Sequence, residues 1–188
     1  KAARGDLVVR PIRGNVDTRL KKLDAGEYNC IVLAGAGLER LGLAHRVTEV
    51  LAPEAFWPAV AQGALVVQIR ADDDRLRSAI AALDDRDTHD AVRAERSFLA
   101  ALAGGCLAPI GGWAHTRSDG WLELGGCVLE EQEDGVHRVV TRAAIDPREQ
   151  TPESLGQSVA SQLRAAGADA MLARMRERAA AEPGNARR

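Results

Sequence analysis

The segment 95–111 divides this chain into two parts with different patterns. A long amphipathic helix is expected at residues 88–103 and should stop at Gly104. Its apolar positions keep helical spacing: Val92, Phe98, Leu99 and Leu102. Cys106 follows the glycine pair, and Pro109 stiffens the exit. After Cys106 the spacing becomes that of strands, so two different layer arrangements are expected on the two sides of this segment.

Short apolar runs alternate with helical segments before this long helix. Strands are expected at residues 7–12, 30–34 and 65–69. Helices are expected at residues 16–25, 36–41 and 72–83. Asn15 fits the N-cap of the first helix, and Gly26 follows its end. This order predicts an α/β layer with parallel strands that are covered on both faces.

Strands followed by helices are expected after Cys106. The strands are predicted at residues 121–129 and 136–145. The acidic residues 130–134 between them are expected to form a solvated turn of hairpin type. Pro152 opens a helix, and a further helix follows Gly167. This part is therefore predicted to be α+β, with an antiparallel sheet and helices.

Composition excludes several classes of protein. The 188 residues are 46% hydrophobic and 28% charged, which is typical of a soluble globular protein. A net charge of −2 offers no basic footprint for nucleic acid, and no apolar stretch approaches the ~20 residues of a membrane span. The three cysteines and four histidines lack metal-ligand spacing, so we expect a reduced, cytoplasmic protein without a metal site.

Two arginines flank the junction between the first expected strand and the first expected helix. Arg13 precedes the helix start and Arg19 follows it. Free backbone N–H groups at a helix N-terminus attract anions, and arginine offers planar, paired donors to carboxylates. The junction therefore indicates a site for an organic polyacid. Two surface arginines in ordinary ion pairs would give the same pattern.

A run of small residues follows the second expected strand. Ala34, Gly35 and Gly37 would let a ligand approach the backbone at the end of that strand. Arg40 would project from the short helix that comes next. The full G-x-G-x-x-G pattern of nucleotide-binding loops is absent, so tight packing of strand on helix explains the glycines equally well.

Cys106 is expected on a loop with little side-chain bulk around it, where a thiol can be reached and modified. The thiolate is the reactive form, and Arg93 or Arg96 on the preceding helix would lower the pKa of the thiol if either points at it. An inert loop thiol is the alternative. Cys30 and Cys127 are assigned to packing, because each lies in an expected strand.

Five blocks occur in one order along nearly the whole chain. They are residues 13–20 (RGNVDTRL), 26–34 (GEYNCIVLA), 36–43 (AGLERLGL), 62–63 (QG) and 104–111 (GGCLAPIG). Together they resemble porphobilinogen deaminase, also called hydroxymethylbilane synthase. The resemblance implies a three-domain enzyme of which this chain is the C-terminal portion, so that domain 1 and the first half of domain 2, with the catalytic Asp, would precede Lys1.

The same resemblance implies a division into three segments. Residues 1–57 would be the second half of domain 2, a partial α/β domain of the periplasmic-binding-protein type. Residues 58–84 would form a hinge crossing and a return segment to domain 1. Residues 85–188 would be domain 3, the α+β domain that carries the cofactor.

By this resemblance, Cys106 anchors a dipyrromethane cofactor through a thioether. The cofactor primes the stepwise condensation of porphobilinogen into a linear tetrapyrrole, with release of ammonia. Arg13, Arg19 and Arg40 match the family positions that bind the acetate and propionate groups, so they would serve in catalysis and in cofactor binding. Further cofactor contacts would come from Ala34, Gly37, Gln62 and Gly63.

The implied protein is a cytoplasmic monomer of haem biosynthesis with porphobilinogen as its small-molecule substrate. Two positions depart from the family pattern: Ala61 stands where many members carry glycine, and Gln68 where an acidic residue is common. We expect the 188 residues alone to be inactive. The alternatives are a non-catalytic anion-binding module, which has no use for the Cys106 loop, and a truncated product without activity.

Overall fold

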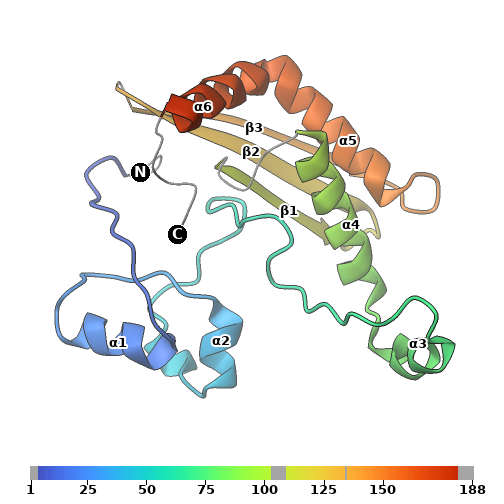
Figure 1. The fold of residues 1–188 in the computed structure, drawn as a ribbon, viewed down its shortest axis with the longest axis horizontal. Helices are drawn as coiled ribbons and strands as arrows, with labels where there is room; N and C mark the ends of the chain where they lie inside the picture. The colour runs from blue at the N-terminus through green and yellow to red at the C-terminus, as the bar shows by residue number, and fades with distance from the viewer. Residues whose placement is uncertain (1–3, 103–108, 134, 182–188) are drawn as a thin grey trace. The chain divides into compact units, whose positions relative to one another are not determined.

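The computed structural model describes residues 4–102, 109–133 and 135–181 (Figure 1). These residues fall into two compact units, one within residues 4–52 and the other within residues 53–181. The described secondary structure of the first unit is helical, whereas the second unit combines helices with a three-stranded sheet.

Helix α1 (Val16–Asp24) of the first unit begins where the sequence predicts. Asn15 caps the helix, because its Oδ1 accepts the backbone N–H of Thr18 at 2.9 Å. Gly26 follows the helix end with a φ of +75°, a conformation that glycine adopts at little cost. Leu20 is the side chain of α1 that is buried.

Helix α2 (Gly35–Arg40) also forms where a helix is predicted. Gly42, with a φ of +70°, follows its end, and a 3₁₀ turn, η1 (Ala44–Arg46), comes next. Leu38 is the side chain of α2 that is buried. The local signals for helix start and stop therefore suffice to predict the positions of both helices of this unit.

The structure has no strand at three places where the sequence predicts one, residues 7–12, 30–34 and 65–69. A strand needs a hydrogen-bonded neighbour, and none of the other described segments pairs with them. Apolar side chains in these segments are exposed, with Val8 85% and Leu65 91% accessible. Cys30 is exposed as well, so the assignment of this thiol to packing is wrong.

The second unit contains two helices that begin at aspartate caps. Helix α3 (Asp74–Ile80) is capped by Asp73 and continues as a 3₁₀ turn, η2 (Ala81–Leu83). Helix α4 (Arg86–Ala101) is capped by Asp85, whose side chain accepts the backbone N–H of Thr88 at 2.8 Å. The predicted stop of this helix at Gly104 lies outside the described residues.

The sheet of the second unit is antiparallel with the order β1-β2-β3. Its strands are β1 (Ile110–Thr116), β2 (Leu122–Gln132) and β3 (Gly135–Ile145). The antiparallel sheet is confirmed, but β1 is not predicted by the sequence, and β2 continues through three residues of the expected turn. The glycines at positions 111 and 112 explain why the sequence does not predict β1, because glycine is depleted in strands.

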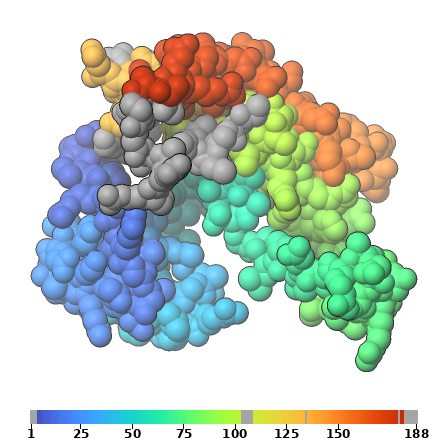
Figure 2. All heavy atoms as spheres, in the orientation of Figure 1, coloured from blue at the N-terminus to red at the C-terminus, as the bar shows by residue number. Residues whose placement is uncertain are grey.

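Helices α4, α5 and α6 cover one face of this sheet (Figure 1). Helix α5 (Pro152–Leu163) starts at the predicted Pro152, and Thr151 caps it. The chain kinks at Gly167, which has a φ of +103°, within the segment η3 (Arg164–Ala168) and continues as α6 (Asp169–Ala181). Side chains of α4 and α5 lie against one another along the surface (Figure 2).

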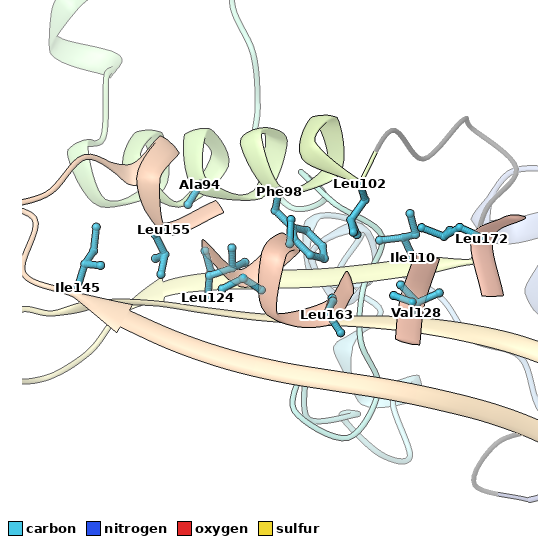
Figure 3. Packing of buried hydrophobic residues seen from close by; sticks show 14 of the residues in the cluster. Ala94, Phe98, Leu102, Ile110, Leu124, Val128, Ile145, Leu155, Leu163 and Leu172 are labelled. Carbon is cyan, nitrogen blue, oxygen red and sulfur yellow. The ribbon is translucent and has the colours of Figure 1, made fainter. Parts of the chain in front are cut away.

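The core of the second unit lies between these helices and the sheet (Figure 3). Phe98 of α4 is fully buried and rests on the backbone of Gly126 in β2, where a Cβ atom would lie 2.5 Å from the ring atom Cζ. Leu124 and Val128 of β2 are also fully buried. The absence of a side chain at position 126 therefore allows the Phe98 ring to pack directly on the backbone of β2.

Glu130 contradicts the prediction of a solvated acidic turn. It belongs to β2, and only 1% of the residue is exposed. Its carboxylate accepts hydrogen bonds from Arg174 of α6 and from Gln132. Arg174 lies 44 residues away in the sequence, so the local acidic composition gives no sign of this ion pair.

Candidate functional site

The junction before α1 is a folded turn. Gly14 has a φ of +121°, and a Cβ at this position would lie 2.8 Å from Thr18 Cγ2. Arg19 Nε donates to the carbonyl of Gly14 at 2.8 Å. One donor of the Arg19 guanidinium thus fixes the turn, and its other N–H groups bond to none of the residues that the structure describes.

Two contacts outside α1 hold the chain that leads into this junction. Tyr28 Oη donates to the carbonyl of Pro11 at 3.0 Å. The guanidinium of Arg10 lies 5.5 Å from the centroid of the Tyr28 ring, within the range of a cation–π interaction. The residues before and after α1 are therefore tied together, which limits where Arg13 can lie.

Arg13 and Arg40 are exposed, and neither forms an ion pair with a carboxylate among the described residues. Arg40 is the last residue of α2. All three predicted arginines, Arg19 included, belong to the unit within residues 4–52. Exposed guanidinium groups without an internal carboxylate can receive the carboxylates of a ligand.

Ala34 and Gly37 belong to the start of α2 and not to an open loop. Ala34 is the N-cap residue, and the N–H of Gly37 donates to its carbonyl at 3.1 Å. Gly35 has no described atom within 4 Å of a Cβ placed on it. The space beside the backbone of Gly35 is therefore open among the described residues, and the predicted approach of a ligand there stays a prediction.

Gln62 and Gly63 lie at the end of a segment that we call the strap, residues 57–63. The strap runs along the free edge of β1: Ala59 pairs with Gly111, and the N–H of Gly112 donates to the carbonyl of Pro58 at 3.0 Å. The strap then turns, because the N–H of Gln62 donates to the carbonyl of Ala59 at 3.3 Å.

Trp57 anchors the other end of the strap on the sheet. Its ring lies against Gly125 of β2, where a side chain would collide with it. The guanidinium of Arg142 in β3 lies 5.2 Å from the ring centroid of Trp57. Phe98 packs on Gly126, the next residue of β2, so Trp57 lies on the sheet face opposite the helices. Val60 of the strap packs against the core on the helix side.

Glu95 of α4 joins the strap to β1. Its Oε2 accepts the N–H of Ala61 at 2.6 Å, and its Oε1 accepts the N–H of Ala114 at 2.8 Å. The residue is 6% exposed, and burial raises the pKa of its carboxyl. Sequence reasoning missed this role, although a glutamate between the buried Ala94 and Phe98 is a signal, because an acid on the apolar face of a helix needs a partner.

Cys106 lies outside the described residues, so its contacts stay predictions. Cys127 is fully buried in β2, and burial raises the pKa of its thiol, which confirms its assignment to packing. His115 of β1 stacks on Trp113 with ring centroids 4.0 Å apart. In the described part of the chain, no group of three or more histidine, cysteine or acidic residues is placed to hold a metal ion. The helices described are all too short or too polar to span a bilayer.

Two family models match this chain. The model described as "Porphobilinogen deaminase, dipyromethane cofactor binding domain" matches residues 1–78. The model described as "Porphobilinogen deaminase, C-terminal domain" matches residues 90–165, which include Glu95 and the sheet. The two matches therefore include both the arginine-bearing unit and most of the sheet-bearing unit.

Curated relatives carry the same name. The porphobilinogen deaminase of Chromobacterium violaceum is 47% identical over 167 residues, which are 89% of this chain and 52% of the relative. That of Thermus thermophilus is 45% identical over 175 residues, which are 93% of this chain and 57% of the relative. The chain thus spans about half the length of these relatives. On these matches, the chain belongs to the porphobilinogen deaminase family.

Proposed function

We propose that this chain provides the C-terminal portion of a hydroxymethylbilane synthase, a transferase of tetrapyrrole biosynthesis. The reaction would join porphobilinogen units into a linear tetrapyrrole and release one ammonia for each unit added. The observation that carries the proposal is the match of both family models, in order, to the two parts of one chain. Identity of 45–47% to named relatives supports it.

Cys106 would hold a dipyrromethane cofactor through a thioether. When bound, this group supplies the primer to which porphobilinogen units are added. A thioether suits the task because it is stable enough to keep the primer through every round. The first family model is named for this cofactor, which supports its presence.

Arg13, Arg19 and Arg40 would bind the acetate and propionate groups of substrate and growing product. Support comes from the exposed guanidinium groups of Arg13 and Arg40, which have no carboxylate partner among the described residues. In Arg19, the hydrogen bond to Gly14 would orient the guanidinium before a ligand arrives. The backbone near Ala34 and Gly37 and the amide of Gln62, with Gly63 beside it, would add uncharged contacts.

The exposed apolar segments of the chain support a larger fold. Residues 7–12 and 30–34 would become strands of a periplasmic-binding-protein-like domain when a polypeptide supplies their neighbours. Val8, Val9 and Val32 are each at least 60% exposed in this chain, which is costly for β-branched apolar side chains. We propose a cytoplasmic monomer as the complete enzyme, and expect the 188 residues alone to be inactive.

Turnover of porphobilinogen tests this function. One sample is the 188-residue chain, and the other is this chain fused behind the N-terminal part of the Chromobacterium violaceum relative. The fusion is expected to release ammonia and form the linear tetrapyrrole, and the chain alone is not. A fusion that binds polycarboxylates without turnover would replace the proposal with the anion-binding module, and turnover by the chain alone would refute its expected inactivity.

A further inference from the structure

We propose that Glu95 is a positioning residue. It fixes the position of Gln62 and Gly63 relative to β1, the edge strand of the sheet. This inference rests on the proposed function only for its consequence in the reaction. We call the two hydrogen bonds that the Glu95 carboxylate accepts, from the strap and from β1, the link. The link can be tested without any substrate.

The two oxygens of the Glu95 carboxylate serve two different segments. One accepts from Ala61 in the strap at 2.6 Å, and the other accepts from Ala114 in β1 at 2.8 Å. These residues lie 34 and 19 positions from Glu95 in the sequence. A single side chain of α4 therefore joins three segments that local structure alone would leave independent.

The chemistry of Glu95 favours such a specific role over simple packing. The residue is 6% exposed, and it forms no ion pair with an arginine or lysine in the described ranges. Burial raises the pKa of its carboxyl, while the two backbone N–H donors lower it. A buried carboxylate without a cation is unfavourable, so an apolar residue would suit this helix face better if the backbone donors did not need an acceptor.

Ala61 shows what the link holds in place. Its φ is +59°, the one positive φ of a non-glycine residue in the described chain. Residues with a Cβ avoid this conformation, and the bond from its N–H to Glu95 offsets the preference. Because Gln62 follows immediately and turns back onto Ala59, the conformation at position 61 sets the direction in which the chain carries Gln62.

The consequence is that Gln62 and Gly63 belong to the sheet-bearing unit. Trp57 and Ala59 already dock the strap on β2 and β1. Glu95 adds a contact next to Gln62, because it accepts the N–H of the preceding residue, Ala61. Cys106 precedes β1 by only four residues in the sequence, so the predicted amide contact of Gln62 would be fixed to the strand that follows the predicted thioether along the chain.

Hydrogen exchange of single amides in the 188-residue chain tests the link. Glu95→Gln keeps the shape of the side chain but replaces one acceptor oxygen with a donor, so both amides cannot stay bonded. We expect at least one of the two N–H groups, that of Ala61 or that of Ala114, to exchange at least tenfold faster in this variant, with β2–β3 amides unchanged. Asp90→Asn is the matched control, because Asp90 is a buried acid of the same helix that bonds Arg86 and Arg93. The control should leave both amides protected.

Two further measurements keep the proposal falsifiable if Glu95→Gln does not fold. In the unmodified chain, NMR couplings across the two hydrogen bonds, from each amide nitrogen to the Glu95 carboxyl carbon, should be detected. Adding Ala61→Gly to Glu95→Gln should restore part of the protection of the strap, because glycine adopts a positive φ unaided. Absence of both couplings, or unchanged exchange at both amides in Glu95→Gln, would overturn the link.

Kinetics of the fusion enzyme separate the link from the function. Glu95→Gln is expected to lower kcat at least tenfold with KM within twofold, and Asp90→Asn to change neither by more than twofold. An intact link with unchanged kcat in Glu95→Gln would overturn the positioning role. A parent fusion that is inactive would refute the proposed function, while the couplings would still decide whether the link exists.

Discussion

Arg174 Nη2 in α6 lies 2.5 Å from Glu130 Oε2 in β2, and Arg178 approaches the same carboxylate at 3.8 Å. The Glu130 side chain is fully buried, whereas that of Arg174 is 45% exposed. The pair connects the last described helix with the middle strand of the sheet. It adds an ion pair with a buried carboxylate to the docking of α6, whose Met171 and Leu172 also lie in the core.

Glu130→Gln should lower the free energy of unfolding by about 1.5–3 kcal/mol, the range for hydrogen bonds to charged groups. The loss is moderate because the exposed Arg174 regains water. Urea unfolding of the 188-residue chain measures it. Arg70→Gln is the control: Arg70 is 81% exposed in its pair with Asp73, and its change should stay below about 0.5 kcal/mol. Equal effects of the two substitutions would contradict the importance of Glu130.

Stability should fall in acid partly through the same carboxylate. The hydrogen bond from Arg174 lowers the pKa of Glu130 from 4.5 to about 2. The unfolded state then binds the proton more readily, so the contribution is complete above about pH 4.5 and is lost as the pH falls toward about 2.

Asp146 titrates in the same window, because Arg148 lowers the pKa of its carboxyl to about 2. The slope of unfolding free energy against pH should therefore be compared between the parent chain and Glu130→Gln. The variant is expected to show the shallower slope between pH 4.5 and 2. Identical slopes would show that Glu130 is not the group responsible.

Gly126→Ala should destabilise the second unit by about 1–3 kcal/mol, the usual cost of overpacking a core. A methyl group there would lie 2.5 Å from Phe98 Cζ, and the ring is fully buried in the core. Thermal unfolding measures the loss. Gly35→Ala serves as the control, since a Cβ at Gly35 meets no described atom within 4 Å. A neutral Gly126→Ala would mean that the ring can shift away.

Arg19→Leu in the fusion enzyme should cost about 2–5 kcal/mol in ligand binding or transition-state stabilisation, since it removes a donor to a carboxylate. The ratio kcat/KM for porphobilinogen measures the effect. Arg46→Leu in the same unit is the matched control, because Arg46 pairs with Asp24 at 2.5 Å and matches no predicted site. Unchanged kinetics in Arg19→Leu would rule out the role assigned to it.

Local signals in the sequence suffice for the helices. Asn15, Asp85 and Thr151 each accept a backbone N–H at the start of a helix, and such caps depend only on residues three positions apart. Gly26 and Gly42 follow helix ends for an equally local reason. These elements could therefore be predicted with boundaries within about two residues, the usual uncertainty of helix ends.

Contacts between distant segments explain what the sequence does not reveal. The predicted strands at 7–12 and 30–34 lack neighbours in the described chain, so Val8, Val9 and Val32 stay exposed. The sequence predicts a turn at Glu130, because its partner Arg174 is remote in the sequence. Likewise, Glu95 gives no local sign that its partners are Ala61 and Ala114.

The sequence predicts the candidate site only where the type of a residue itself indicates its chemistry. Arginines at positions 13, 19 and 40 and a thiol after a glycine pair are visible in the sequence. That the strap with Gln62 docks on the edge of β1 is not visible, because the docking depends on glycines in a strand that the sequence hides. The edge of the sheet is therefore the place where the sequence predicts both the fold and the site least well.

Intact mass of the active fusion enzyme tests the central claim, that Cys106 carries the primer, most directly. The parent protein should be heavier than its sequence by two linked pyrrole units, and peptide mapping should place the addition on Cys106. Cys106→Ser should have the mass of its sequence and no turnover, whereas Cys127→Ser should keep the addition. An active protein whose Cys106 is unmodified would contradict the claim.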